Sequence, residues 1–205
     1  MKILVFANDM AWYELTEGIT GVQWIRAENI ASFADSDDMA AYFNLSDDAN
    51  ETDHSSFKRP VFINSVVDTL KEIHAAGNVI RINGWNSFLK RTSWEVAGNL
   101  NDDFLAVFKA MNKTAIAVPD EPGFIAARII AMIINEAYFA KEENVSSEKE
   151  IDIAMKLGTN YPYGPFEWAD IIGIKNIHAL LKNLSATDNR YKPSPLLEQA
   201  AMKNQ

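Results

Sequence analysis

Residues 118–170 decide the fold of this chain and read VPDEPGFIAARIIAMIINEAYFAKEENVSSEKEIDIAMKLGTNYPYGPFEWAD. Pro122 suits the first turn of a helix, and the apolar segment that follows it predicts a long helix ending at about Glu143. Its apolar residues recur at three- and four-residue steps but also occupy other faces. A helix that is apolar nearly all round is buried by neighbouring helices or by a partner subunit.

The second half of this stretch predicts a cluster of shorter helices. Ser147 and Glu150 have the spacing of a capping box, which predicts a helix over Glu148–Leu157 that Gly158 ends. Further helices are predicted from Pro165, over Ile174–Leu184 and over Pro193–Ala201. Residues 120–205 are therefore expected to form an all-α domain.

The first 119 residues have a different pattern, in which short β-rich runs alternate with polar helical stretches. The strand candidates are Lys2–Ala7, Gly21–Ile25, Ala41–Leu45, Pro60–Asn64, Val79–Asn83, Thr92–Val96 and Thr114–Val118. The helix candidates are Met10–Glu17, Asp35–Ala40, Val66–Ala75 and Asp102–Met111, and residues 46–59 are expected to form a long exposed loop. Such alternation predicts a mostly parallel α/β sheet over residues 1–119.

Composition excludes several classes of protein. The net charge of −9 among 205 residues argues against binding nucleic acid or an anionic membrane surface, both of which need clustered Lys and Arg. The chain has no cysteine, which excludes disulfides, thiolate nucleophiles and zinc–thiolate sites, and no metal site is expected. The longest apolar run, Ile129–Ile134, is far too short to span a membrane. A cytoplasmic location is expected.

Three blocks carry a resemblance to a known family: PGFIAARI from Pro122, NEA from Asn135 and AMKLGTNYPYGPFEWAD from Ala154. Together they resemble the C-terminal helical domain of the 3-hydroxyacyl-CoA dehydrogenases of fatty-acid metabolism. The resemblance implies a Rossmann-like NAD-binding domain before the helical one, an acyl-CoA ligand and a homodimer formed through the helical domain.

The turn after the first strand departs from the pattern that this family implies. A dinucleotide-binding turn carries G-x-G-x-x-G so that backbone amides can approach the pyrophosphate. Residues 7–12 instead read Ala-Asn-Asp-Met-Ala-Trp, with no glycine and with an acidic group at Asp9. The second strand ends in Arg26 rather than in an acidic residue, and Glu28 is a weak substitute. A reduced Rossmann-like domain is therefore expected, with no cofactor; NAD is expected only if the chain is an active dehydrogenase.

The catalytic positions of the family are also altered. The segment from Val79 to Phe88 resembles the strand and loop that hold the catalytic histidine, and in this alignment Asn83 takes the place of that histidine while Asn86 matches the motif's asparagine. Glu95 follows Asn83 by twelve residues, which is the separation of the family's histidine and glutamate. An amide does not titrate, so Asn83 can donate or accept hydrogen bonds but cannot act as a base.

Two further family positions give a mixed result. The asparagine of the helix-opening motif is Ala127 here, and Ser65 lies near the family's substrate-binding serine. The candidate site residues are therefore Glu95, as a catalytic remnant, and Asn83, Asn86 and Ser65, as substrate-binding groups. Glu95 has an alternative role as a structural carboxylate paired with Arg81 or Lys90. The three histidines, His54, His74 and His178, are expected at surface or boundary positions.

Three functional hypotheses follow, and these residues leave open whether the chain is an enzyme. The first is a 3-hydroxyacyl-CoA dehydrogenase-like protein without NAD-dependent catalysis that binds an acyl-CoA-like ligand. The second is an active 3-hydroxyacyl-CoA dehydrogenase with a displaced base. The third is a non-catalytic interaction or scaffolding subunit.

Overall fold

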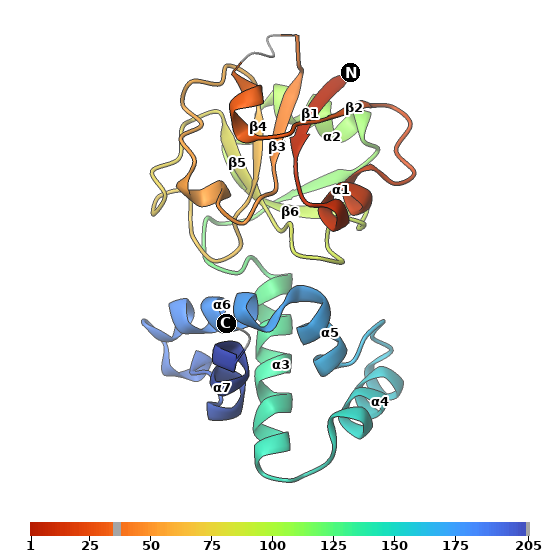
Figure 1. The fold of residues 1–205 in the computed structure, drawn as a ribbon, viewed down its shortest axis with the longest axis vertical. Coiled ribbons are helices and arrows are strands. Elements are labelled where there is room, and N and C mark those ends of the chain that lie inside the picture. Colours follow the sequence, from red (N-terminus) through yellow and green to blue (C-terminus); the bar gives the residue numbers. More distant parts are fainter. Residues whose placement is uncertain (35–37, 204–205) are drawn as a thin grey trace. The chain divides into compact units, whose positions relative to one another are not determined.

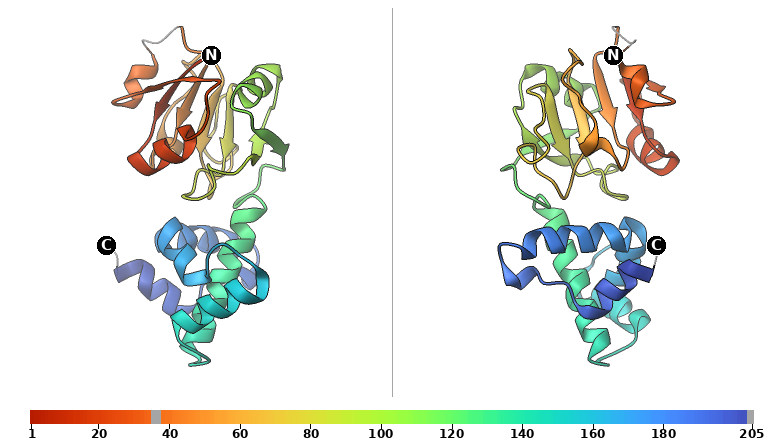
Figure 2. Two further views of the ribbon diagram at one scale, coloured as in Figure 1. Left: turned by 90° about the vertical axis from the view of Figure 1, so that its right-hand side faces the viewer. Right: turned by 60° about the vertical axis from the view of Figure 1, so that its left-hand side comes forward.

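The computed structural model describes residues 1–34 and 38–203. The chain divides into two compact units, Met1–Phe124 and Ile125–Gln205, called here the sheet unit and the helical unit. Figures 1 and 2 show strands confined to the first unit and long helices to the second. This is the predicted combination of an α/β and an all-α part.

The sheet unit is built on seven strands in the described part of the chain. They are β1 (Lys2–Phe6), β2 (Gln23–Arg26), β3 (Ala41–Asn44), β4 (Val61–Asn64), β5 (Val79–Ile82), β6 (Ser93–Gly98) and β7 (Thr114–Ala117). Their order is β2-β1-β3-β4-β5-β6-β7. Neighbours pair in parallel, except that β5 and β6 are antiparallel. All seven overlap the predicted strands.

The two faces of this sheet are covered differently. Helices α1 (Asp9–Thr16) and α2 (Asp102–Ala110) pack on one face, where Ile3, Phe43 and Phe62 are fully buried. The other face is covered by the 3-10 helices η1 (Ile30–Phe33) and η2 (Ala49–Glu51) and by loop residues such as Phe57 and Ile73. In a doubly wound fold α-helices cover both faces, so this domain is reduced on one side.

Two helix predictions in the sheet unit fail. Residues 35–37 of the predicted helix Asp35–Ala40 lie outside the described residues, and residues 38–40 are not helical. Val66–Ala75 forms turns rather than a regular helix. Thr69 starts a single turn with a bond from Ile73 N–H to its carbonyl, but His74 has a left-handed φ of 50° and ends the turn at once.

A buried arginine fastens the last residues of the sheet unit to the sheet. Arg81 on β5 is 0% exposed; its Nε donates to Asp120 Oδ1 at 2.5 Å and its Nη1 to the Ser65 carbonyl at 3.0 Å. Its guanidinium also lies 4.4 Å from the ring centre of Phe124 and donates to the Glu121 carbonyl. Desolvation lowers the pKa of Arg81, and Asp120 opposes that shift. The segment that leads to the helical unit is thereby fixed at its start.

The helical unit is organised around one long helix (Figure 1). Its elements are α3 (Ala126–Glu142), α4 (Glu148–Thr159), α5 (Pro165–Ile172), α6 (Ile174–Ser185), η3 (Asn189–Tyr191) and α7 (Pro195–Lys203). Helix α3 contacts α4, α5, α6 and α7. It begins at Ala126 rather than at Pro122, because Gly123 and Phe124 have positive φ angles of 84° and 49°. No helix in the described residues is long and apolar enough to cross a membrane.

The ends of α4 and α5 explain several residues in and around the loop between them, residues 160–164. The capping box of Ser147 and Glu150 is present, but α4 continues past Gly158 and ends with Asn160 in a left-handed conformation. Asp152 on α4 accepts hydrogen bonds from Phe166 N–H at 2.8 Å and Glu167 N–H at 3.2 Å, at the start of α5. A Cβ at Gly164 would lie 2.3 Å from Asp152 Oδ1, so only glycine fits there. These residues serve helix packing.

Candidate functional site

The antiparallel pairing of β5 and β6 brings two of the candidate residues together. Arg81 pairs with Ala97 and Ile82 with Val96. One further step in this register places Asn83 opposite Glu95. Because side chains of directly opposed residues point to the same face of a sheet, the twelve-residue separation in the sequence becomes a juxtaposition in space.

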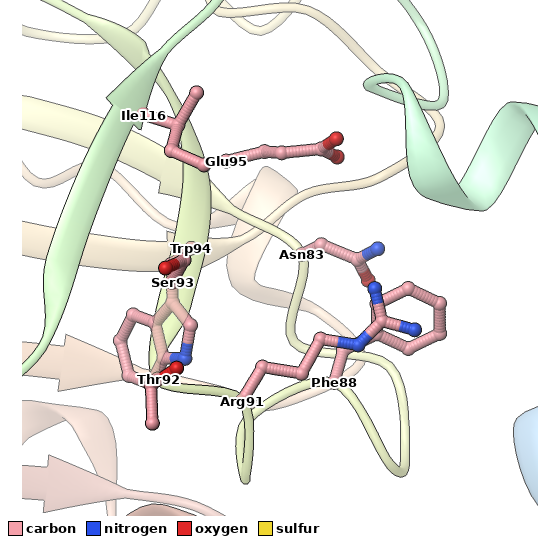
Figure 3. A pocket seen from close by; sticks show the side chains of 8 residues that line it. All are labelled: Asn83, Phe88, Arg91, Thr92, Ser93, Trp94, Glu95 and Ile116. Carbon is pink, nitrogen blue, oxygen red and sulfur yellow. The ribbon is translucent and has the colours of Figure 1, made fainter. Parts of the chain in front are cut away.

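Asn83 and Glu95 line a cavity of about 370 Å³, called here the β5–β6 pocket. Its walls come from the end of β5, from the loop that follows it and from β6 and β7. The lining residues are Asn83, Phe88, Arg91, Thr92, Ser93, Trp94, Glu95 and Ile116 (Figure 3). Figure 3 shows the polar ends of Asn83, Arg91 and Glu95 pointing to the same side.

Asn83 carries an unused hydrogen-bond donor. Its side chain is buried, at 7% exposure, and its Oδ1 accepts from Trp85 N–H at 3.2 Å. Its Nδ2 has no hydrogen-bond partner within the described residues. Buried polar groups are nearly always paired, and an unpaired one is costly. The amide is thus held by its oxygen while its N–H groups remain available to a ligand oxygen.

Arg91 adds a cation to the pocket. Its guanidinium stacks 4.1 Å from the ring centre of Phe88. Desolvation lowers the pKa of Arg91, and the nearby negative charge of Glu95 opposes this shift. Arginine remains charged at any physiological pH, so the pocket combines a guanidinium, a carboxylate and an amide donor.

The loop between β5 and β6 is held in place by two neighbouring side chains. Glu14 on α1 is buried and accepts Ser87 N–H with both oxygens at 2.9 Å, and burial raises the pKa of Glu14. Lys113 donates its Nζ to the carbonyls of Leu89 at 2.9 Å and Arg91 at 2.8 Å. Desolvation lowers the pKa of Lys113 to about 8. The backbone that carries Arg91 is therefore fixed by contacts with Lys113, which does not line the pocket.

The remaining candidate residues lie elsewhere. Ser65 is buried and donates its Oγ to the Asp68 carbonyl at 2.7 Å, and it does not line the β5–β6 pocket. Asn86 is half-buried in the loop after β5, outside the lining. Ala127 lies on α3 in the helical unit and is fully buried. Arg81, one suggested partner of Glu95, pairs with Asp120 instead.

One histidine was placed wrongly by sequence. His54 is buried rather than superficial, because it packs beside Asn44 with its Nε2 3.2 Å from Asn44 Nδ2, and burial lowers its pKa. His74 forms the left-handed end of a turn, and His178 on α6 lies 3.8 Å from Glu198. Within the described residues, no group of three or more His, Asp and Glu side chains is placed to hold a metal ion.

The turn after β1 can be tested for its fit to a dinucleotide. Asn8 caps α1 by accepting Ala11 N–H at 2.9 Å, so one of the free amides at the helix start is already used. The Asp9 side chain is 94% exposed and pairs with Arg26 at 2.6 Å. Arg26 also donates to the Ala7 carbonyl at 3.0 Å and lies over the Trp12 ring. These residues do not fit a pyrophosphate bound in the glycine-rich manner, which needs free amides and no carboxylate.

The comparisons with known proteins match the helical unit to a known family. Residues 123–205 match the family model described as 3-hydroxyacyl-CoA dehydrogenase, C-terminal domain. The 3-hydroxyadipyl-CoA dehydrogenase of Escherichia coli (strain K12) is 47% identical over 92 residues, which are 44% of this chain and 19% of that protein. A probable 3-hydroxybutyryl-CoA dehydrogenase of Bacillus subtilis (strain 168) is 39% identical over 99 residues, 47% of this chain and 34% of the relative. The matches thus span about a fifth to a third of these relatives.

Solved structures extend the similarity of the fold to both units. The (S)-3-hydroxybutyryl-CoA dehydrogenase from Ralstonia eutropha covers 99% of this chain and 94% of its own, with a TM-score of 0.74 and 17% identity. The 3-hydroxybutyryl-CoA dehydrogenase from Escherichia coli K12 has a TM-score of 0.58 and 33% identity, and the match covers 69% of this chain and 31% of that one. The predicted fold, a Rossmann-like sheet followed by a helical domain, is confirmed.

The comparisons correct the expectation that no cofactor is used. The relatives that share the helical domain are named dehydrogenases, and a dehydrogenase passes hydride to a cofactor. The expectation is wrong because it excludes a cofactor mainly on the turn after β1, residues 7–12. The missing glycines bear on how a pyrophosphate could be held, and not on which chemistry the family performs.

Proposed function

The chain belongs to the 3-hydroxyacyl-CoA dehydrogenase family through its C-terminal unit, and from this we propose that it binds a CoA thioester whose acyl group enters the β5–β6 pocket. The observation that carries the proposal is the buried and unpaired Nδ2 of Asn83. A thioester or hydroxyl oxygen of the ligand would accept a hydrogen bond from it. Arg91 and Glu95 supply further polar contacts on the same side of the pocket (Figure 3).

Calorimetric titration with 3-hydroxybutyryl-CoA tests this binding. Asn83→Asp keeps an oxygen for Trp85 N–H and removes the N–H donors, so we expect the affinity to fall about tenfold, as for loss of a hydrogen bond of about 1.4 kcal/mol. Asn99→Asp, an exposed residue beyond β6, makes the same change of charge outside the pocket and should bind normally. No saturable binding at millimolar ligand would contradict the proposal and favour a scaffolding role.

A second candidate function is an active dehydrogenase with a displaced base, which is favoured by the dehydrogenase names of the relatives. The side chain at the family's histidine position is an amide that cannot accept the substrate proton. A positioned base typically contributes about 10²–10⁴-fold to a rate, so the activity would need another group in that role. Formation of reduced cofactor from 3-hydroxybutyryl-CoA, with NAD and with NADP in turn, measures it directly. No reduced cofactor with either would contradict this candidate.

We further propose that residues 1–119 act as the Rossmann-like domain and residues 120–205 as the helical domain, and that the chain forms a homodimer through the latter. Several apolar side chains of the helical unit are exposed, among them Ile129 at 52%, Ile153 at 44% and Leu157 at 83%. Exposed apolar surface of this kind is typical of interfaces. Leu157→Glu is expected to shift the protein to a monomer in sedimentation velocity, whereas Leu105→Glu, on α2 of the sheet unit, should not.

A further inference from the structure

The β5–β6 pocket has a combination of groups that suits a reaction other than hydride transfer. Glu95 provides a carboxylate, which can accept a proton. Asn83 and Arg91 provide an amide N–H and a guanidinium, which can stabilise negative charge on an oxygen (Figure 3). A proton acceptor and preorganised donors on the same side of one pocket can promote removal of a proton next to a carbonyl group.

We propose that this pocket exchanges the C2 protons of a bound CoA thioester, with Glu95 as the base and with Asn83 and Arg91 as the donors to the thioester oxygen. The proposal rests on the CoA thioester binding proposed above. It assigns a catalytic role to Arg91, which the sequence did not single out, and it replaces the remnant role of Glu95 with an active one.

The step is balanced within the protein and its ligand. The C2–H bond breaks and its proton moves to a carboxylate oxygen of Glu95. The electron pair of that bond forms a C1–C2 double bond, while the π pair of the C1 carbonyl moves onto its oxygen. Return of a proton from Glu95 restores the thioester. Once the carboxyl proton has exchanged with solvent, the net change is the replacement of a C2 proton by a solvent proton.

The donors are preorganised in two ways. The bond from Trp85 N–H to Asn83 Oδ1 leaves the Nδ2 as the free end of a buried amide, and a ligand oxygen would relieve the penalty of that unpaired donor. Arg91 is stacked on Phe88, and its carbonyl is held by Lys113 at 2.8 Å. Donors already held in position need no reorganisation as charge develops on the oxygen, which is the usual source of such stabilisation.

Deuterium incorporation tests the proposal. 3-Hydroxybutyryl-CoA is incubated with the protein in deuterium oxide, and loss of the C2 proton signal is followed by NMR. We expect exchange above the rate without protein. Glu95→Gln, which keeps the shape and removes the base, should lower the rate at least about 100-fold. Glu143→Gln, an exposed residue of the helical unit, is the matched control and should exchange at the wild-type rate.

A second pair of variants tests the donors. Asn83→Asp and Arg91→Gln should each lower the exchange rate at saturating ligand by about 10²-fold, the usual effect of losing one such donor. Wild-type protein that binds the thioester in calorimetry but gives no exchange would overturn the inference and leave the proposed binding intact. Exchange that persists in Glu95→Gln would overturn the role of Glu95. Failure to bind any CoA thioester would overturn both proposals.

Discussion

At the scale of single residues, Arg81 and Arg91 show how differently this fold uses two guanidinium groups. Arg81 is 0% exposed and is surrounded by Asp120 and by the carbonyls of Ser65, Asp68 and Glu121. Its guanidinium nitrogens donate to these protein acceptors, which gives Arg81 a structural role. Arg91 has its backbone held and its charged end in the pocket, which leaves that end able to meet a ligand.

The structural role of Arg81 gives a stability prediction. Arg81→Met should lower the free energy of unfolding of the sheet unit by about 3–5 kcal/mol, because removing one partner of a buried pair leaves Asp120 and the carbonyls without their donor. Urea denaturation followed by tryptophan fluorescence measures the loss. Arg59→Met replaces an exposed arginine and is expected to change stability by less than about 0.5 kcal/mol. Equal stability of the two variants would contradict the structural role.

Lys113 gives a prediction about pH. Desolvation lowers its pKa to about 8, whereas an ordinary lysine titrates near about 10.4. Between these values the unfolded chain binds the extra proton and the folded one does not, so the contribution of Lys113 to stability increases as pH rises through this window. Acetic anhydride labelling read by mass spectrometry should give half-maximal reactivity of Lys113 near pH 8. A midpoint above pH 10 would contradict the shift.

At the scale of secondary structure, the sequence predicts best where the signal is local. All seven strand candidates overlap observed strands. The central ones, such as β3 and β5, are short runs of β-branched, aromatic and other residues that the sheet buries throughout. The Ser147 capping box forms as expected. The Val66–Ala75 helix fails because Leu70 N–H and Lys71 N–H are directed to Asp120, fifty and forty-nine residues away, and His74 ends the turn. Such distant partners are invisible in a local pattern.

The candidate site, too, is predicted where the signal is local and missed where it depends on distant pairing. The separation of Asn83 and Glu95 pointed to a pair, and the antiparallel register of β5 and β6 explains it. Arg91 is missed because it lies between the predicted runs Val79–Asn83 and Thr92–Val96, and only the folded loop between β5 and β6 brings it to the pocket that Asn83 and Glu95 line. An antiparallel interpretation of the two runs, with Arg91 just before the second, would have indicated it.

The caps of the helices can be tested at this scale with α2. Asn101 Oδ1 accepts from Asp103 N–H at 3.1 Å and Phe104 N–H at 3.3 Å, and α2 supplies Phe104 and Phe108 to the core of the sheet unit. Asn101→Ala should therefore lower the stability of this unit by about 1 kcal/mol, and Asn101→Asp, which retains a capping oxygen, by much less. Urea midpoints of the two variants check the difference. An equal loss would show that the cap is not the cause.

At the scale of the whole molecule, the chain forms two compact units, and the second of them matches a family model. Residues 123–205 match this model, whereas the structure that covers 99% of the chain shares its fold at only 17% identity. Packing demands some residues of the helical unit, such as Gly164 beside Asp152. In the sheet unit, by contrast, the buried Nδ2 of Asn83 has no partner among the described residues, so packing does not account for this amide.

Separate cores predict that the chain unfolds in more than one step. Trp12, Trp24, Trp85 and Trp94 lie in the sheet unit and only Trp168 in the helical unit, so tryptophan fluorescence reports mainly the former. Circular dichroism at 222 nm reports mainly the helical unit, which holds the longer helices. We expect urea transitions that do not coincide between the two probes, as in other multi-domain chains.

The variant Arg81→Met tests this independence. It should move the fluorescence transition to lower urea and leave the transition seen by circular dichroism in place. Coincident transitions that shift together would mean that the two units unfold as one cooperative body.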